Sequence, residues 1–187
     1  MLLLKGGYLL KNERNRLNMI KHFATGLNSL LLTLFLLTGA ITAAEAFEAR
    51  VIGIMDGDTI EVLKDRKPVR IRLYGVDSPE HDQDFGSKAR RFTSEKVFRK
   101  TVEIVPIETD KYGRIVGKVY IDGSYLNRMI VQEGYAWWYK SFASKEHDLE
   151  QAELEARKAR RGLWAHPNPV PPWKFRRHHK PISGNGF

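Results

Sequence analysis

The stretch VIGIMDGDTIEVLKDRKPVRIRLYGVDSPE, residues 51–80, carries the pattern that decides the fold. Its first half holds two segments rich in strand-forming residues, Val51–Met55 and Thr59–Leu63, separated by the turn sequence Asp56-Gly57-Asp58. Lys64–Pro68 follows and is typical of a polar hairpin turn. These signals predict two adjacent strands and a hairpin leading into a third.

The third strand is predicted by strict alternation along residues 69–74. The apolar set is Val69, Ile71 and Leu73, and the other set is Arg70, Arg72 and Tyr74. A period of two places these sets on opposite faces of a strand. An arginine on the open face of a curved sheet can point into a ligand groove.

The remaining pattern predicts two more strands, Thr101–Ile107 and Ile115–Ile121, and three helices. Two of the helices are expected at Ser87–Arg99 and at Ser124–Glu133, the latter stopping at Gly134. Five strands in short hairpins with about three helices indicate a mainly β, α+β domain, a small barrel capped by helices. Pattern alone leaves other α+β folds open.

The third helix has the clearest periodicity. Apolar residues recur at spacings of three and four, at Leu149, Ala152, Ala156, Ala159 and Leu163. Ser144 is the expected N-cap, and Gly162 follows two arginines where a C-terminal glycine belongs. We therefore expect this helix to begin just after Ser144.

Composition limits the function classes. A chain of 187 residues suffices for one domain with tails, and its net charge of +9 stays positive when residues 1–46 are set aside. A basic protein attracts polyanions such as nucleic acids. The absence of cysteine excludes disulfides, thiolate metal sites and a cysteine nucleophile.

The two ends of the chain differ from the domain, which is expected to span residues 47–165. Phe23–Ala44 carries no charge, and Ala44-Glu45-Ala46 fits a cleavage site, so residues 1–46 are predicted to be a signal peptide. Met19 would start a signal peptide of more ordinary length. If this signal peptide is cleaved, the protein is exported to the periplasm or outside the cell. The alternative is that residues 23–44 stay attached as a membrane anchor.

Residues 166–187 are rich in proline, aromatic and basic residues and are predicted to form an extended tail. Interleaved aromatic and basic side chains could grip single-stranded nucleic acid. The alternative is that Trp173 and Phe175 dock on the domain while the charges stay solvated.

Carboxylates and arginines occupy turns and strand ends in the order needed for phosphodiester chemistry. Asp56 and Asp58 flank a glycine, and Asp77-Ser78-Pro79-Glu80 follows the strand that carries Arg72. Oxygen ligands of this kind suit a hard cation, and arginines bind phosphate oxygens through a planar fork. Each residue alone could instead belong to an ordinary polar turn or surface. An EF-hand is excluded, because Lys67 stands where its closing glutamate would be.

From Asp56 to Arg114 the order, spacing and residue types resemble the staphylococcal nuclease (thermonuclease) family, with a weaker match from Val51 to Trp164. The resemblance implies a five-stranded OB-fold barrel. It implies Ca²⁺ as cofactor, with Asp58 and Asp77 as ligands, Ser78 as a ligand through its main-chain carbonyl, and Asp56 as a supporting neighbour. Threonine is more frequent in the family at the position of Ser78, a change that a main-chain ligand tolerates.

The resemblance also assigns the remaining site residues. Glu80 corresponds to the general base toward water, and Arg72 and Arg114 to the two phosphate arginines. Lys111 and Tyr112 correspond to residues that contact a terminal phosphate. Tyr139 falls near a tyrosine that packs on the base, although its aromatic neighbourhood could equally be core. The loop His81–Phe85 is shorter than its counterpart in the family prototype.

The function implied is a Ca²⁺-dependent phosphodiesterase that cleaves DNA and RNA by water attack on phosphorus and leaves 3′-phosphate ends. Single-stranded nucleic acid with little sequence preference is the expected substrate, and the protein is expected to be a monomer without an obligate protein partner. The alternative is a binding module on the same fold without catalysis.

Overall fold

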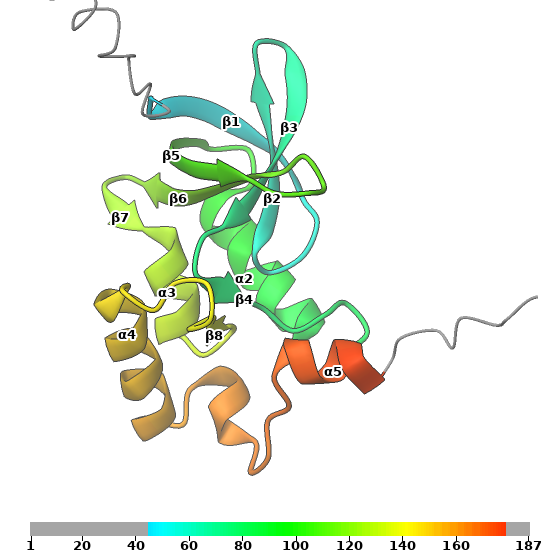
Figure 1. Ribbon diagram of the computed structural model, residues 1–187, viewed down its shortest axis with the longest axis vertical. Coiled ribbons are helices and arrows are strands. Elements are labelled where there is room, and N and C mark those ends of the chain that lie inside the picture. Colours follow the sequence, from blue (N-terminus) through cyan, green and yellow to red (C-terminus); the bar gives the residue numbers. More distant parts are fainter. Residues whose placement is uncertain (1–44, 179–187) are drawn as a thin grey trace, which may run out of the picture. The chain divides into compact units, whose positions relative to one another are not determined.

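Five strands form a sheet that closes on itself in this computed structural model, which describes residues 45–178 (Figure 1). The strands are β1 (Phe47–Ile54), β2 (Thr59–Lys64), β3 (Lys67–Leu73), β5 (Thr101–Thr109) and β6 (Ile115–Ile121). Their order is β3-β2-β1-β5-β6, extended by the short β7 (Ser124–Tyr125). Parallel pairing of β3 with β6, from Ile71 opposite Ile115 to Leu73 opposite Gly117, closes the barrel. The predicted five-stranded barrel is confirmed.

The predicted alternation in β3 is also confirmed. Ile71 and Leu73 are buried in the barrel core, whereas Arg70 is exposed and Arg72 lies on the other face. The core continues into the helices, where Leu126, Ile130 and Leu149 are fully buried. Each such side chain contributes roughly 1.5–3 kcal/mol by leaving water.

Four helices accompany the barrel, and Figure 1 shows them gathered at one end of it. They are α2 (Gly86–Val97), α3 (Leu126–Gln132), α4 (His147–Lys158) and α5 (Pro172–His178). A 3₁₀ helix, η1 (Gly162–Ala165), follows α4, and a second small sheet pairs β4 (Val76–Asp77) with β8 (Trp137–Trp138). None of the helices within residues 45–178 is long and apolar enough to cross a membrane.

The predicted N-cap of the third helix is wrong. The helix begins at His147 rather than after Ser144, and no side chain of the described residues caps it. The preceding chain is held in turns, with the Ala143 amide donating to the Tyr139 carbonyl and the Glu146 amide to the Ala143 carbonyl. The helix also ends at Lys158, so Gly162 does not cap it but begins η1.

The C-terminal segment departs from the extended chain that its composition predicts. Residues 172–178 form helix α5, which begins at Pro172, a residue suited to a first helical position. Trp173 stacks on Tyr139 with ring centroids 5.5 Å apart, and the side chain of Gln83 donates from Nε2 to the Val170 carbonyl at 2.5 Å. Docking of Trp173 therefore agrees with the alternative, but the expectation that the charges stay solvated is wrong for Arg176, which pairs with Asp77 and Glu80. Residues 179–187 and the predicted signal peptide up to residue 44 lie outside the described residues.

Candidate active site

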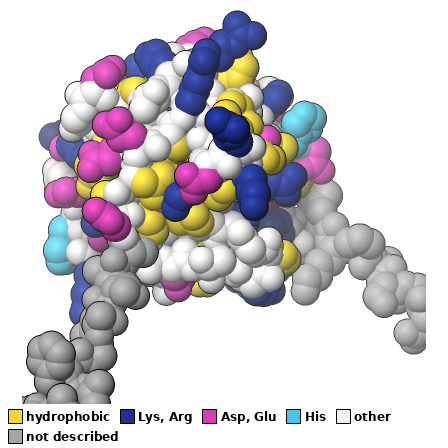
Figure 2. Space-filling view, turned by 90° about the horizontal axis from the view of Figure 1, so that it is seen from above, with side chains coloured by type: hydrophobic (Ala, Val, Ile, Leu, Met, Phe, Trp, Pro, Cys, Tyr) yellow, Lys and Arg dark blue, Asp and Glu magenta, His cyan; other side chains and the backbone are white. Residues whose placement is uncertain are grey.

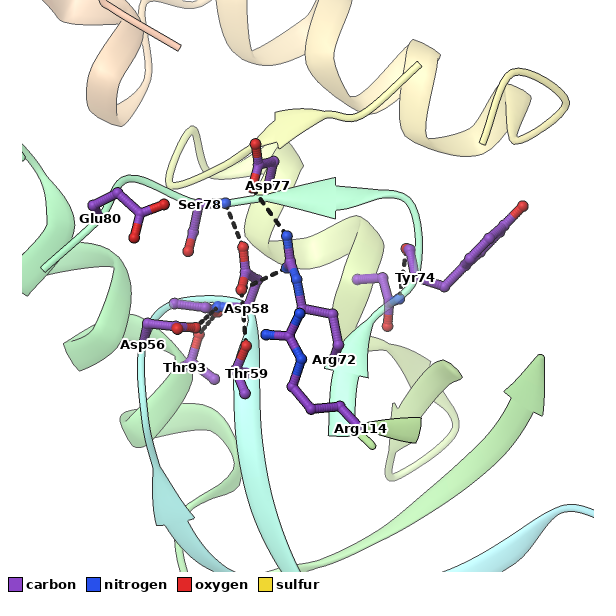
Figure 3. A network of polar contacts seen from close by, with 12 residues as sticks. Asp56, Asp58, Thr59, Arg72, Tyr74, Asp77, Ser78, Glu80, Thr93 and Arg114 are labelled. Carbon is purple, nitrogen blue, oxygen red and sulfur yellow. Dashed lines mark hydrogen bonds and ion pairs between the residues drawn. The ribbon is translucent and has the colours of Figure 1, made fainter. Parts of the chain in front are cut away.

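A cleft of about 840 Å³ contains every site residue predicted from the sequence. The lining includes all ten predicted residues: Asp56, Asp58, Arg72, Asp77, Ser78, Glu80, Lys111, Tyr112, Arg114 and Tyr139. They come from the β1–β2 turn, β3, β4 and the loop after it, the β5–β6 hairpin and the end of β8. Figure 3 shows Asp56, Asp58, Asp77 and Glu80 around one space, with Arg72 and Arg114 extending toward Asp58.

The β1–β2 turn is fixed from three sides. The Asp58 amide donates to Asp56 Oδ1 at 3.1 Å, and Thr93 of α2 donates its hydroxyl to the Gly57 carbonyl at 2.6 Å. A Cβ at Gly57 would lie 2.8 Å from both Ala89 and Ser78. The glycine is required because helix α2 and the loop after β4 press on the turn that holds the two aspartates.

Asp58 is a buried carboxylate with three partners. Its Oδ2 accepts the Ser78 amide at 2.6 Å, and its Oδ1 accepts the Thr59 hydroxyl at 3.1 Å and lies 2.5 Å from Arg72 Nη1. Burial opposes its ionisation, but the charge of Arg72 and these hydrogen bonds outweigh burial and lower the pKa of Asp58. The residue is 4% exposed and stays ionised.

Arg72 links the two predicted cation ligands. Its Nη2 donates to Asp77 Oδ1 at 2.9 Å. Its Nη1 forms an ion pair with Asp58 but has no hydrogen-bond partner among residues 45–178. The side chain is only 15% exposed. Burial alone would lower its pKa, yet Asp58 and Asp77 raise it, so that the guanidinium stays charged.

Asp77 and Asp56 carry carboxylates that burial disfavours. Asp77 is 1% exposed, and burial raises its pKa although Arg72 and Arg176 pair with it. Burial, followed by the charge of Asp58, raises the pKa of Asp56 to about 7. The cluster therefore has more buried negative charge than its arginines neutralise.

Glu80 lies on a tight loop that joins β4 to α2. The Glu80 amide donates to the Gln83 side chain at 3.2 Å, and the Gln83 amide donates to the Glu80 carbonyl at 3.0 Å. A Cβ at Gly86 would overlap that same carbonyl oxygen. The short loop thus fixes the backbone of Glu80, whose carboxylate Oε1 accepts a hydrogen bond from Arg176 at 2.5 Å.

The β5–β6 hairpin presents Arg114, Lys111 and Tyr112. Asp110 organises this loop, because its Oδ1 accepts the amides of Tyr112 (2.9 Å) and Arg114 (3.0 Å) and its Oδ2 accepts Arg114 Nε (2.7 Å). Burial alone would raise the pKa of Asp110, but the hydrogen bonds from Arg114 and Tyr112 hold it below its usual range. Tyr112 is 71% exposed at the mouth of the cleft.

Tyr139 lies at the opposite wall. Its amide donates to the Gly75 carbonyl at 2.8 Å, and its ring stacks on Trp173 and is tilted against Phe142 at 4.8 Å. Trp137 and Trp138, which precede it, are buried. The two tryptophans therefore belong to the core, and Tyr139 both packs on aromatic neighbours and lines the cleft.

Sequence reasoning missed two residues of the cleft. Asp110 directly precedes the predicted residues Lys111 and Tyr112, and its spacing of four from Arg114 across a turn could have indicated the pair. Arg176 lies 96 residues beyond Glu80, and its position in a basic run carries no sign of the contact.

Comparison with known proteins places this constellation in a family. The family model described as "Staphylococcal nuclease homologue" matches residues 70–166. The chain belongs to the staphylococcal nuclease family. The matched residues include Arg72, Asp77, Glu80 and Arg114, and they end before α5.

Individual relatives agree with this membership. The chain is 40% identical over 148 residues to a "Micrococcal nuclease" of Shigella flexneri, which covers 74% of this chain and 85% of the relative. It is 41% identical over 146 residues to an "Uncharacterized endonuclease" of Escherichia coli, an alignment that covers 78% of this chain and 94% of the relative. A "Staphylococcal-like nuclease CAN1" of Arabidopsis thaliana is 38% identical over 111 residues, which are 59% of this chain and 34% of the relative.

The donors in the cleft of this staphylococcal nuclease homologue fit a hard cation. Residues 45–178 contain no group of three or more His, Cys, Asp or Glu side chains arranged to hold a metal. The three aspartates Asp56, Asp58 and Asp77, however, outnumber the two arginines, Arg72 and Arg176, that pair with Asp58 and Asp77. Two carboxylates with the Ser78 main-chain carbonyl form an oxygen-only set, which suits Ca²⁺ or Mg²⁺ better than Zn²⁺.

Proposed function

We propose that this protein is an exported, monomeric, Ca²⁺-dependent phosphodiesterase that hydrolyses DNA and RNA and leaves 3′-phosphate ends. The chain is a nuclease by family membership and by its nuclease-named relatives. The observation that carries the finer proposal is that Glu80, Arg72 and Arg114 line one cleft together with the carboxylates of Asp58 and Asp77.

In this proposal Asp58, Asp77 and the Ser78 carbonyl hold the cation. When bound, the cation supplies Lewis-acid polarisation of the phosphate and helps to neutralise its charge. Oxygen donors suit a hard cation, and among such ions Ca²⁺ is the one expected from the resemblance to the family.

Glu80 orients the attacking water and accepts its proton. The loop contacts with Gln83 fix its backbone, so the carboxylate is positioned before substrate binds. Such acid–base assistance is typically worth about 10²–10⁴-fold in rate. Water attacks phosphorus, and the 5′-oxygen leaves.

Arg72 and Arg114 bind the non-bridging oxygens as charge develops on them. Both guanidiniums are held by aspartates, Arg72 by Asp58 and Asp77 and Arg114 by Asp110, so little reorganisation is needed. Removing one such donor costs roughly 3 kcal/mol in the transition state.

Substrate contacts outside the reacting phosphate are proposed for Lys111 and Tyr112, at a terminal phosphate, and for Tyr139, against a base. On the face seen in Figure 2, Lys and Arg side chains lie among acidic and hydrophobic ones rather than in one continuous basic surface. Contacts to phosphates and base faces read little sequence, which favours a single-stranded substrate of any sequence.

The experiment incubates the purified protein with single-stranded DNA and RNA in Ca²⁺ or in excess chelator, and identifies product ends by mass spectrometry. We expect cleavage in Ca²⁺ only, with 3′-phosphate ends. Tight binding with no cleavage in either condition would favour the alternative, a binding module without catalysis. Cleavage that persists in chelator would contradict the cation requirement.

A further inference from the structure

Arg176 reaches into the cleft from helix α5 and binds two of its carboxylates. Its Nη2 donates to Asp77 Oδ2 at 2.9 Å, and its Nη1 donates to Asp77 Oδ1 at 3.2 Å and to Glu80 Oε1 at 2.5 Å. The planar guanidinium thus grips Asp77 with both terminal nitrogens and bridges it to Glu80.

These contacts use the oxygens that a cation would need. Asp77 Oδ1 also accepts Arg72 Nη2, so both oxygens of this carboxylate, in a residue 1% exposed, already bind positively charged donors. A divalent cation at Asp77 would lie within a few ångströms of the Arg176 guanidinium. Like charges at that separation repel each other, most strongly where they lie next to a buried carboxylate such as Asp77.

The fold keeps Arg176 close to Asp77 and still allows it to leave. Trp173, one helical turn earlier, stacks on Tyr139 and lies edge-on to Trp137 at 6.4 Å, while Val170 is held by Gln83. These anchors keep the effective concentration of the guanidinium high. The Arg176 side chain is itself 43% exposed, so its rotation into solvent disturbs no core contact.

We propose that Arg176 is a built-in competitor for the cation, which binds Asp77 and Glu80 in the cation-free protein and is displaced when the cation binds. The inference rests on the proposed function in taking Asp77 as a cation ligand. This competition is reciprocal. Arg176 lowers the affinity for the cation, and the bound cation disfavours the Arg176 contacts by the same factor. Arg176 also stabilises the cation-free protein, because it gives the buried carboxylate of Asp77 a second charged partner beside Arg72.

The test measures Ca²⁺ affinity by titration calorimetry for the wild type, Arg176→Met and the matched control Arg177→Met. Arg177 is the exposed neighbour on α5, and its side chain has no hydrogen bond or ion pair with other side chains of residues 45–178, so its loss changes the net charge by the same amount without removing such a contact. We expect Arg176→Met to bind Ca²⁺ at least about fivefold more tightly than the wild type, with Arg177→Met within about twofold of it.

A second readout is the melting temperature with and without Ca²⁺. In chelator, Arg176→Met should melt below the wild type and below Arg177→Met, and Ca²⁺ should raise its melting temperature by more. Arg176→Lys keeps the positive charge but loses the planar guanidinium. Its Ca²⁺ affinity and its melting temperature in chelator should lie between those of the wild type and of Arg176→Met.

The outcomes separate this inference from the proposed function. Equal Ca²⁺ affinity of the wild type and Arg176→Met, or weaker binding by the variant, overturns the competition alone. Absence of Ca²⁺ binding in both overturns the cation site, and the competition with it. Binding by Arg176→Met but not by the wild type is the strongest support.

Discussion

Replacement of Arg72 by methionine should destabilise the protein in a way that Ca²⁺ reverses. Arg72 pairs with Asp58 at 2.5 Å and Asp77 at 2.9 Å while 15% exposed, so its loss leaves two buried carboxylates with less positive charge. Breaking a buried ion pair by removing one partner typically costs about 3–5 kcal/mol. Cation binding at the same carboxylates should return much of that cost.

The assay is urea unfolding followed by tryptophan fluorescence, in chelator and in saturating Ca²⁺. With a slope of about 1–3 kcal/mol per molar urea, the expected loss lowers the midpoint by about 2 M in chelator. The matched control is Arg70→Met on the same strand, whose side chain is 60% exposed and 3.7 Å from Glu61, a surface pair worth about 0–1 kcal/mol.

The reasoning is refuted if Arg72→Met and Arg70→Met unfold at the same urea concentration in chelator. A large loss that Ca²⁺ leaves unchanged would refute the cation site at Asp58 and Asp77 while leaving the buried ion pair intact. Activity supplies an independent measure, because kcat/KM of Arg72→Met should fall by about 10²-fold or more at saturating Ca²⁺.

Two further predictions concern the loops that hold the site. Asp110→Asn removes the charge-assisted hydrogen bond that holds Arg114 and should therefore lower kcat/KM by about tenfold. A kcat/KM equal to that of the wild type would exclude a role of Asp110 in positioning Arg114. Because folding lowers the pKa of Asp110, ionised Asp110 stabilises the folded protein above about pH 4. The free energy of unfolding of the wild type should therefore exceed that of Asp110→Asn at higher pH, and the difference should disappear as the pH falls through the pKa of Asp110 in the folded protein. Gly86→Ala forces a Cβ onto the Glu80 carbonyl and should cost about 1–3 kcal/mol with a fall in kcat. The control Gly113→Ala has no described atom within 4 Å of its Cβ and should cost about 1 kcal/mol through its positive φ; equal costs for the two would contradict the steric argument.

Local patterns in the sequence predicted the strands, and the resemblance to the staphylococcal nuclease family predicted the barrel that they form and the residues of the site. The alternation of residues 69–74 placed Arg72 opposite Ile71 and Leu73, and β3 forms as expected. The predicted site residues lie on β3 and β4 or in the turns and loops next to strands, and the fold brings all of them to one cleft. Periodicity and turn signals predict the hairpins between neighbouring strands, whereas the parallel pairing of β3 with β6, which closes the barrel, joins segments far apart in the sequence.

What could not be predicted depends on contacts between distant segments. The late start of α4 reflects turns around Tyr139–Glu146 and the pairing of Glu146 with Lys118 at 2.8 Å, which outweigh the capping preference of Ser144. The docking of α5 depends on Trp173 meeting Tyr139, a contact that composition does not indicate. The composition of a proline-rich, basic segment predicts an extended tail, and the prediction changes only when the surface on which the segment packs is known.

The most direct test of the central claim compares kcat/KM of the wild type, Glu80→Gln and Asp82→Asn on single-stranded DNA in Ca²⁺. Asp82 is an exposed carboxylate in the same loop and serves as the matched control. We predict a loss of about 10²–10⁴-fold for Glu80→Gln, with Ca²⁺ and DNA binding retained, and little change for Asp82→Asn. Wild-type activity in Glu80→Gln would contradict the assignment of this cleft as the site of hydrolysis.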